Sequence, residues 1–218
     1  MSRARALSIV AVAALAVACL ASCASPDFKY AAQRPGSVPA GTVYFKVPWS
    51  WTEFPAEQIV KAQQGWSADS TAKTLLDATT WQSAYDAAPQ PSLTDVFGTG
   101  TPEAPVVYAS LRSLYSAESD AATSAALRDM VVPLSTLGTA VNVTTDDVMT
   151  QGKVTGVHVV YSYLPLPGAA EITIDQTSYL SAEKDAVYLL VVRCSTTCYA
   201  AHRDEISRVV SSYTIQED

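Results

Sequence analysis

The sequence predicts an α+β protein, a three-layer α/β/α sandwich around a mainly antiparallel sheet. Four strand-like runs follow one another in the second half of the chain and are separated only by short turns, as in an antiparallel meander. Helical patterns come before and after this meander. The fourth run is apolar at every position of 187–192, so it needs cover on both faces, and the sheet must lie between two layers.

The first 22 residues predict a bacterial lipoprotein signal peptide. Two arginines precede an apolar run that ends in Leu20-Ala21-Ser22-Cys23, the layout of a secretory leader with a lipobox. The apolar stretch 6–22 is shorter than the ~20 residues of a spanning helix. We therefore expect Cys23 to become the mature N-terminus, with a thioether-linked diacylglycerol and palmitate-type acylation, at the extracytoplasmic face of the cell membrane. A plain secreted protein and an uncleaved anchor are the alternatives.

The charge limits the partners. The chain has 14 Lys+Arg against 21 Asp+Glu, and loss of the leader leaves 12 basic against 21 acidic residues, a net charge of −9. No basic surplus exists to neutralise phosphates, which argues against a nucleic-acid partner. The chain has two histidines, which supply few ligands for a histidine-rich metal centre. We therefore expect neither a metal nor a cofactor.

Residues 23–41 predict a lipidated N-terminus and a flexible tether, because three prolines and two glycines in 24–41 break any regular element. About 17 residues of flexible chain span on the order of 20–25 Å. The globular domain is expected over 42–218, close to the membrane and separated from it by the tether.

The first half of that domain predicts strands and helices in mixed order. A strand over 42–47 ends in Pro48-Trp49-Ser50-Trp51, and Thr52 is a plausible N-cap of a helix that runs to about residue 64. The segment 70–85 is ambiguous, with helix favoured. A strand over 106–115 alternates two faces, and an Ala-rich helix capped near Ser119 is expected to reach about residue 130.

The second half predicts the meander and a closing helix. Its strands are expected over 141–150, 154–164, 171–182 and 186–194. In the third, polar residues alternate with isoleucines, which predicts one solvent-facing side. A final helix over about 199–213 carries an apolar stripe.

This pattern resembles PsbP-like domains at both ends of the domain. The opening strand ends in Pro48-Trp49-Ser50-Trp51, and the last strand begins at 185–190 before a turn and a helix that finishes at 209–213. In particular, the chain resembles actinobacterial lipoproteins of the LpqN type, which carry this fold behind a lipobox. The resemblance covers about 42–215. It implies a PsbP-like fold and an accessory or docking role, and it carries over no catalytic residue.

Cys194 and Cys198 are the only cysteines that remain once the leader is removed and Cys23 is acylated. In an oxidising compartment they are expected to form a disulfide across the turn after the last strand. A redox-active pair is one alternative, although the spacing is C-x-x-x-C. A metal site that adds His202, one turn later, is another.

Trp49 and Trp51 are the candidate binding residues. In an extended segment, two residues that are two positions apart point to the same side. Such a pair forms an aromatic platform for a sugar ring or an apolar partner, unless one or both fill the core. His158 and His202 are the candidate histidines of a hydrolase, but the chain has no G-x-S-x-G motif.

Three functions follow, in order of preference. The first is a membrane-anchored accessory or protein-interaction domain of the bacterial cell envelope, without covalent chemistry, which an exposed apolar patch would favour. The second is a binder of a small apolar or glycan envelope ligand, which an aromatic-lined cavity of several hundred Å³ would favour. The third is a hydrolase, which a Ser or Asp within hydrogen-bonding reach of a histidine in a cleft would favour.

Overall fold

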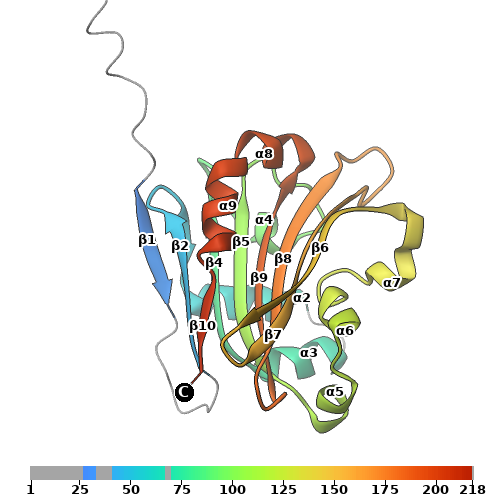
Figure 1. Cartoon of the computed structure of the whole chain (residues 1–218). Helices are drawn as coiled ribbons and strands as arrows, with labels where there is room; N and C mark the ends of the chain where they lie inside the picture. The colour runs from blue at the N-terminus through green and yellow to red at the C-terminus, as the bar shows by residue number, and fades with distance from the viewer. Residues whose placement is uncertain (1–26, 33–40, 67–69, 218) are drawn as a thin grey trace, which may run out of the picture.

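A computed structural model of the chain describes residues 27–32, 41–66 and 70–217 (Figure 1). The predicted signal peptide and the predicted lipidation site at Cys23 lie outside the described residues. A seven-stranded sheet, the main sheet, has the order β3-β4-β5-β9-β8-β7-β6, and every neighbouring pair is antiparallel. Its strands are β3 (Thr52–Phe54), β4 (Thr79–Asp86), β5 (Val106–Ser113), β6 (Val141–Gln151), β7 (Val154–Tyr163), β8 (Ile172–Leu180) and β9 (Ala186–Ser195).

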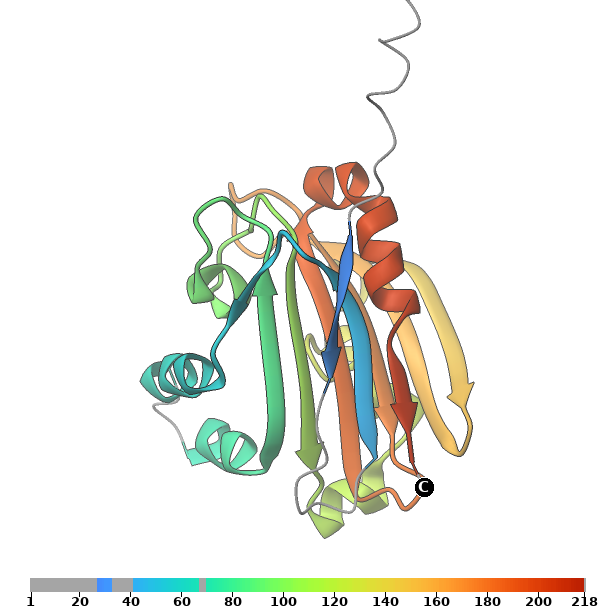
Figure 2. The ribbon, with the colours of Figure 1, turned by 90° about the vertical axis from the view of Figure 1, so that its left-hand side faces the viewer.

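A second, three-stranded antiparallel sheet has the order β1-β2-β10. It consists of β1 (Phe28–Ala32), β2 (Thr42–Pro48) and β10 (Thr214–Gln216). Figure 2 shows it in front of the main sheet, beside the last helices. Val43, Phe45 and Val47 of β2 are fully buried and belong to the same core cluster as residues of β5 and β9.

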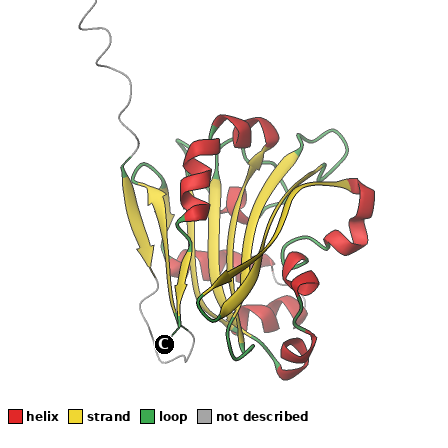
Figure 3. Ribbon diagram, in the orientation of Figure 1, coloured by secondary structure: helices red, strands yellow, loops and turns green. Residues whose placement is uncertain are grey.

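Helices complete both outer layers (Figure 3). One face of the main sheet is covered by α2 (Ala56–Trp66), α3 (Ser70–Asp77), α4 (Leu93–Phe97), α5 (Ser116–Ala121), α6 (Ser124–Arg128) and α7 (Leu134–Leu137), which a 3-10 turn at Gly138–Ala140 follows. The opposite face is covered by α8 (Thr196–Ala201), α9 (Arg203–Ser211) and the small sheet. The mixed α/β class with a large antiparallel sheet is confirmed, and one outer layer combines helices with strands.

The apolar strand β9 is central, as its sequence predicts, with three strands on either side. Tyr188, Leu190 and Val192 face the core under the small sheet, whereas Val187 and Val191 join the clusters under α6 and α7. Burial on both faces therefore explains why the segment 187–192 is apolar throughout. The predicted alternation of β5 is also confirmed.

Three helix predictions for the domain are wrong in their limits. Thr52 lies in β3 instead of capping a helix, and α2 begins only after Pro55. The segment 70–85 is part helix, α3, and part strand, β4, because pairing with β5 outweighs local helical preference. The Ala-rich segment forms two short helices, since the side chain of Thr123 accepts a hydrogen bond from the backbone N–H of Ala126 and starts α6 anew.

The prediction that β8 has a solvent-facing side is wrong. Thr173, Asp175 and Thr177 are all buried, because α8 and α9 cover this face. Burying such groups is favourable only when they find partners. The hydroxyl of Thr173 donates to that of Thr196 over 3.0 Å, and Asp175 has two partners described below.

The predicted flexible tether is partly a strand. Phe28–Ala32 pairs with β2, and the side chain of Ala31 is buried in the core. The prolines and glycines that suggested a tether fall almost entirely outside this strand. Only four residues, 24–27, lie between Cys23 and β1. Among the described residues, no helix is long and apolar enough to cross a membrane.

Candidate functional site

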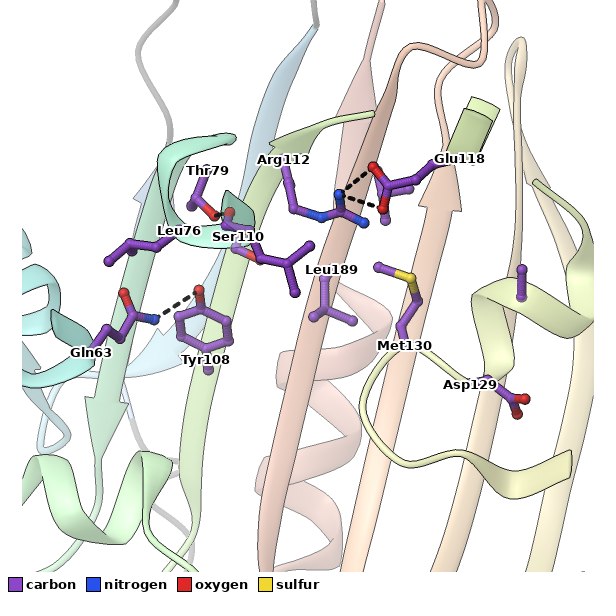
Figure 4. A pocket seen from close by; sticks show the side chains of 13 residues that line it. Gln63, Leu76, Thr79, Tyr108, Ser110, Arg112, Glu118, Asp129, Met130 and Leu189 are labelled. Carbon is purple, nitrogen blue, oxygen red and sulfur yellow. Dashed lines mark hydrogen bonds and ion pairs between the residues drawn. The ribbon is translucent and has the colours of Figure 1, made fainter. Parts of the chain in front are cut away.

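Two adjoining cavities of about 560 Å³ and 350 Å³ lie on the face of the main sheet that α2 to α7 cover. They share four lining residues, Gln63, Tyr108, Met130 and Leu189, so they form one continuous groove. We call it the helix-side groove. Figure 4 shows its larger part, with the side chains converging from α2, β5, β9 and the segment after α6.

Strand periodicity places the floor of the groove. Along β5, the residues opposite the core-facing Val107, Ala109 and Leu111 point into the groove, and they are Tyr108, Ser110 and Arg112. Leu189, on the neighbouring strand β9, supplies the apolar centre of the floor. The polar face of β5 was recognisable in the sequence, but its role as the floor depends on the spacing of the helices above it.

An ion pair closes one end of the groove. Arg112 donates two hydrogen bonds to Glu118 of α5, each 2.9 Å long, and the backbone N–H of Tyr115 donates a third over 3.0 Å. Partial burial would raise the pKa of Glu118, but the bonds from Arg112 and Tyr115 outweigh it and lower that pKa. Because these charges neutralise each other, they offer a ligand little electrostatic attraction.

The middle of the groove is aromatic and neutral. The hydroxyl of Tyr108 donates to Gln82 over 3.0 Å and accepts from Gln63 over 3.4 Å, and burial raises its pKa. The ring of Phe97 meets it edge-on, with the centroids 5.1 Å apart. Arg193 lines the other end and donates to the carbonyl oxygen of Gly100.

The rim of the groove exposes apolar side chains to solvent. Leu75 of α3 lines the larger cavity with 41% of its surface exposed, and Val131, after α6, lines the smaller one with 37% exposed. An apolar floor with an exposed apolar rim is typical of a surface that binds a partner. The arrangement can bind and orient an occupant with an apolar surface.

Trp49 and Trp51 do not form the predicted aromatic platform. Trp49 is 65% exposed, whereas Trp51 is 3% exposed and belongs to the core. The N–H of Trp51 bonds to the carbonyl oxygen of Pro48 over 3.1 Å, so the chain turns here and the alternation of an extended strand no longer applies. Neither tryptophan lines the helix-side groove.

Cys194 and Cys198 form a disulfide between the end of β9 and α8, with their Cα atoms 5.9 Å apart. His202 lies at the break between α8 and α9, and its Nδ1 is 3.0 Å from Glu205 Oε2. Within the described ranges, no three His, Cys, Asp or Glu side chains are grouped as a metal site. The structure therefore assigns the two cysteines to a disulfide.

His158 lies on the opposite face of the sheet from the groove. Its Nε2 is 2.8 Å from Asp175 Oδ1, in a cleft beneath α9. An aspartate within hydrogen-bonding distance of a histidine in a cleft is one of the features that would favour a hydrolase. In the described part of the chain no serine bonds to the ring, so the arrangement is a His–Asp pair and not a triad.

Comparison with known proteins finds no matching family model and no matching curated protein. Solved structures with a similar fold include LpqN, involved in cell envelope biogenesis of Mycobacterium tuberculosis, at 13% identity over 87% of this chain and 91% of that one, with a TM-score of 0.47. Cyanobacterial PsbP from Synechocystis sp. PCC 6803 has 9% identity over 90% and 99%, with a TM-score of 0.49. The Ran-binding protein Mog1p of Saccharomyces cerevisiae has 11% identity over 88% and 96%, with a TM-score of 0.47.

Proposed function

We propose that this protein is a membrane-anchored lipoprotein that acts as an accessory or protein-interaction domain in the bacterial cell envelope. Its helix-side groove binds an apolar segment of a partner protein. The observation that carries this proposal is the exposed apolar rim formed by Leu75 and Val131 above the apolar floor at Leu189. Burying such a surface against a partner removes apolar area from water.

The shape of the groove favours a protein segment over an enclosed small molecule. Small-molecule sites bury roughly 70–90% of the surface of their ligand. Here helices flank the floor, and the rim is exposed to solvent. An occupant that also covers Leu75 and Val131 therefore buries more apolar surface than a ligand confined to the floor. The ion pair of Arg112 with Glu118 fixes α5 beside the groove without drawing a charged ligand.

The anchor places the domain close to the membrane. If Cys23 carries the lipid, the four residues 24–27 allow β1 to begin at most about 18 Å from it. The N–H of Trp49 bonds to the carbonyl oxygen of Asp27 over 2.8 Å, so this exposed tryptophan also lies near the anchor. Tryptophan is favoured where protein meets the membrane–water interface. A partner in the groove is therefore expected to be a membrane or membrane-bound envelope protein.

One observation favours the second candidate function, binding of a small apolar or glycan envelope ligand. The cavities of about 560 Å³ and 350 Å³ fall within the range of small-molecule sites. In addition, the buried Nε of Arg193 has no hydrogen-bond partner in the described residues. A ligand with a polar head at this end and an apolar body along the floor would satisfy it.

Photocrosslinking in the native envelope tests the proposal. A photoreactive residue replaces Leu75 at the rim or, as the matched control, Leu166, which is 55% exposed and does not line the groove. We expect a discrete crosslinked protein from position 75 only, and its loss when Leu189→Gln is added to the floor. Met130→Gln, at a residue that lines both cavities, is the second variant in case the first lowers stability.

Two results would decide against a protein partner. Equal crosslinking from positions 75 and 166 means that the groove is not the binding surface. A small molecule that copurifies with the wild-type protein and is absent from the Leu189→Gln variant in native mass spectrometry supports the second candidate function instead.

A further inference from the structure

A cleft of about 570 Å³ lies on the face of the main sheet opposite the helix-side groove, between α9 and strands β6, β7 and β8. We call it the His158 cleft. Polar and apolar side chains line it together, and the polar residues that matter here are His158, Asp175, Thr177, Tyr199 and Arg203. None of them lines the groove.

A buried carboxylate organises the floor of the His158 cleft. The side chain of Asp175 is 4% exposed. Its Oδ1 is 2.8 Å from His158 Nε2, and its Oδ2 accepts a 2.7 Å hydrogen bond from the hydroxyl of Tyr199. Both carboxylate oxygens therefore already have a donor, and the pair fixes which nitrogen of the ring faces away from Asp175.

The first helix after β9 positions Tyr199. The disulfide between Cys194 and Cys198 ties the start of α8 to the end of β9. The hydroxyl of Thr173 on β8 also contacts that of Thr196 over 3.0 Å. These two links hold α8 over the sheet, so that Tyr199 reaches Asp175.

Three donor groups of the cleft, on His158, Arg203 and Thr177, have no acceptor among the described residues. In the described structure, His158 Nδ1 has no hydrogen-bond partner, and Arg203 at the mouth forms no ion pair. The hydroxyl of Thr177 is buried and also without a partner among these residues. A ligand that brings acceptor atoms would satisfy groups that otherwise stay unpaired.

The local charges select the kind of acceptor. The hydrogen bond to Asp175 raises the pKa of His158 against the opposing effect of burial, and Asp147, its cross-strand neighbour, adds to the rise. The ring is thus a cationic donor over a wider pH range. The carboxyl groups of Asp175 and Asp147 lie beside the ring, so a ligand with one negative charge fits the cleft better than a ligand with two.

We propose that the His158 cleft binds a small molecule through a monovalent oxyanion, a carboxylate, held by His158 Nδ1–H and the guanidinium of Arg203. The hydroxyl of Thr177 donates to the same ligand. Charge-assisted bonds of this kind are the stronger class of hydrogen bond. The site does not depend on the groove having a partner.

Nuclear magnetic resonance of the His158 ring, with acetate as the probe, tests this inference. We expect a saturable shift of the ring signals with acetate and not with chloride at equal ionic strength, and a further rise of the His158 pKa when acetate is bound. Arg203→Gln should weaken acetate binding by about tenfold or more. Arg208→Gln is the matched control, because Arg208 lies on the same helix, over the ring of Phe28, and outside the cleft.

The inference is overturned if chloride reproduces the effect of acetate, or if Arg203→Gln and Arg208→Gln bind acetate equally. His158→Gln should also lose binding. Arg203 is exposed on α9, so its substitution leaves the core intact. The comparison of Arg203→Gln with Arg208→Gln therefore still tests the inference if His158→Gln unfolds the protein.

Discussion

Asp175 is a carboxylate in the interior of the main sheet, where an unpaired charge would be costly. His158 and Tyr199 supply partners for its two oxygens at 2.8 Å and 2.7 Å. Burial and the nearby charge of Asp175 raise the pKa of Tyr199, so its hydroxyl stays protonated and remains a donor. The three residues form one unit in which each group depends on the others.

This unit predicts a pH dependence of stability. The groups that face His158 are Asp147 on β6, Asp175 on β8, Tyr199 on α8 and Arg203 on α9. Because the folded protein raises the His158 pKa above its ordinary 6.5, the protonated ring stabilises the fold fully below that value. The contribution is lost as pH rises through the raised pKa.

Chemical unfolding on either side of this window measures the effect. We expect the wild-type free energy of unfolding to fall by on the order of 1 kcal/mol as pH rises from about 5.5 to about 8.5. His158→Gln should remove most of this difference. A wild-type pH dependence that His158→Gln reproduces in full would contradict the assignment.

At the scale of elements, the connection from β9 to α9 is held by a disulfide and by a helix cap. The disulfide closes it on one side, and the side chain of Ser195 accepts a hydrogen bond from the N–H of Cys198 as the N-cap of α8. The helix predicted over 199–213 is divided at His202, which ends α8 and precedes α9. The break allows α8 to lie over β8 while α9 packs against β2.

Removing the disulfide should weaken the protein modestly. The closed loop is short, so we expect Cys194→Ala with Cys198→Ala to lower the free energy of unfolding by about 2 kcal/mol or less. A reducing agent should shift the unfolding midpoint of the wild type by a similar amount and leave the double variant unchanged. Mass spectrometry of the oxidised protein should find two hydrogens fewer than the dithiol form. Free thiols in the mature protein would refute the disulfide.

Across the whole molecule, the two faces of the main sheet carry different surfaces. One has the helix-side groove, and the other has the His158 cleft and the small sheet. β1 belongs to that small sheet, and four residues separate it from Cys23. If Cys23 carries the proposed lipid, the anchor joins the domain on the small-sheet side, and the groove lies on the opposite face of the main sheet.

Replacing the proposed lipidation site tests the anchor. We expect Cys23→Ser to move the protein from the membrane fraction to the soluble fraction and to remove the mass of the lipid from the mature chain. Diacylation anchors stably because each buried methylene contributes about 0.8 kcal/mol. The Cys194→Ala and Cys198→Ala double variant is the control and should stay in the membrane fraction. Unchanged fractionation and mass in Cys23→Ser would disprove the anchor, and the groove experiment would still stand on its own.

Local sequence patterns predicted the strands in which each face keeps the same surroundings along its whole length. The period-two alternation of β5 and the wholly apolar β9 predicted both faces of each strand, because every second residue meets the same layer. The cysteine spacing predicted the disulfide, since the two residues flank one turn. The sequence alone also predicts the leader and lipobox.

Only the tertiary structure decided which polar strand face is exposed to solvent and where the candidate sites lie. The Thr173, Asp175 and Thr177 face of β8 has the pattern of an exposed strand, and it is buried because α8 and α9 return over it from the far end of the chain. Trp49 and Trp51 separate because a turn intervenes between strands. The groove exists because α2 and α3 stand apart from α5 and α6 on one sheet face. The turn at the two tryptophans is local, but the burial of β8 and the groove depend on contacts between separate segments, and local sequence patterns do not encode which segment will cover a given face.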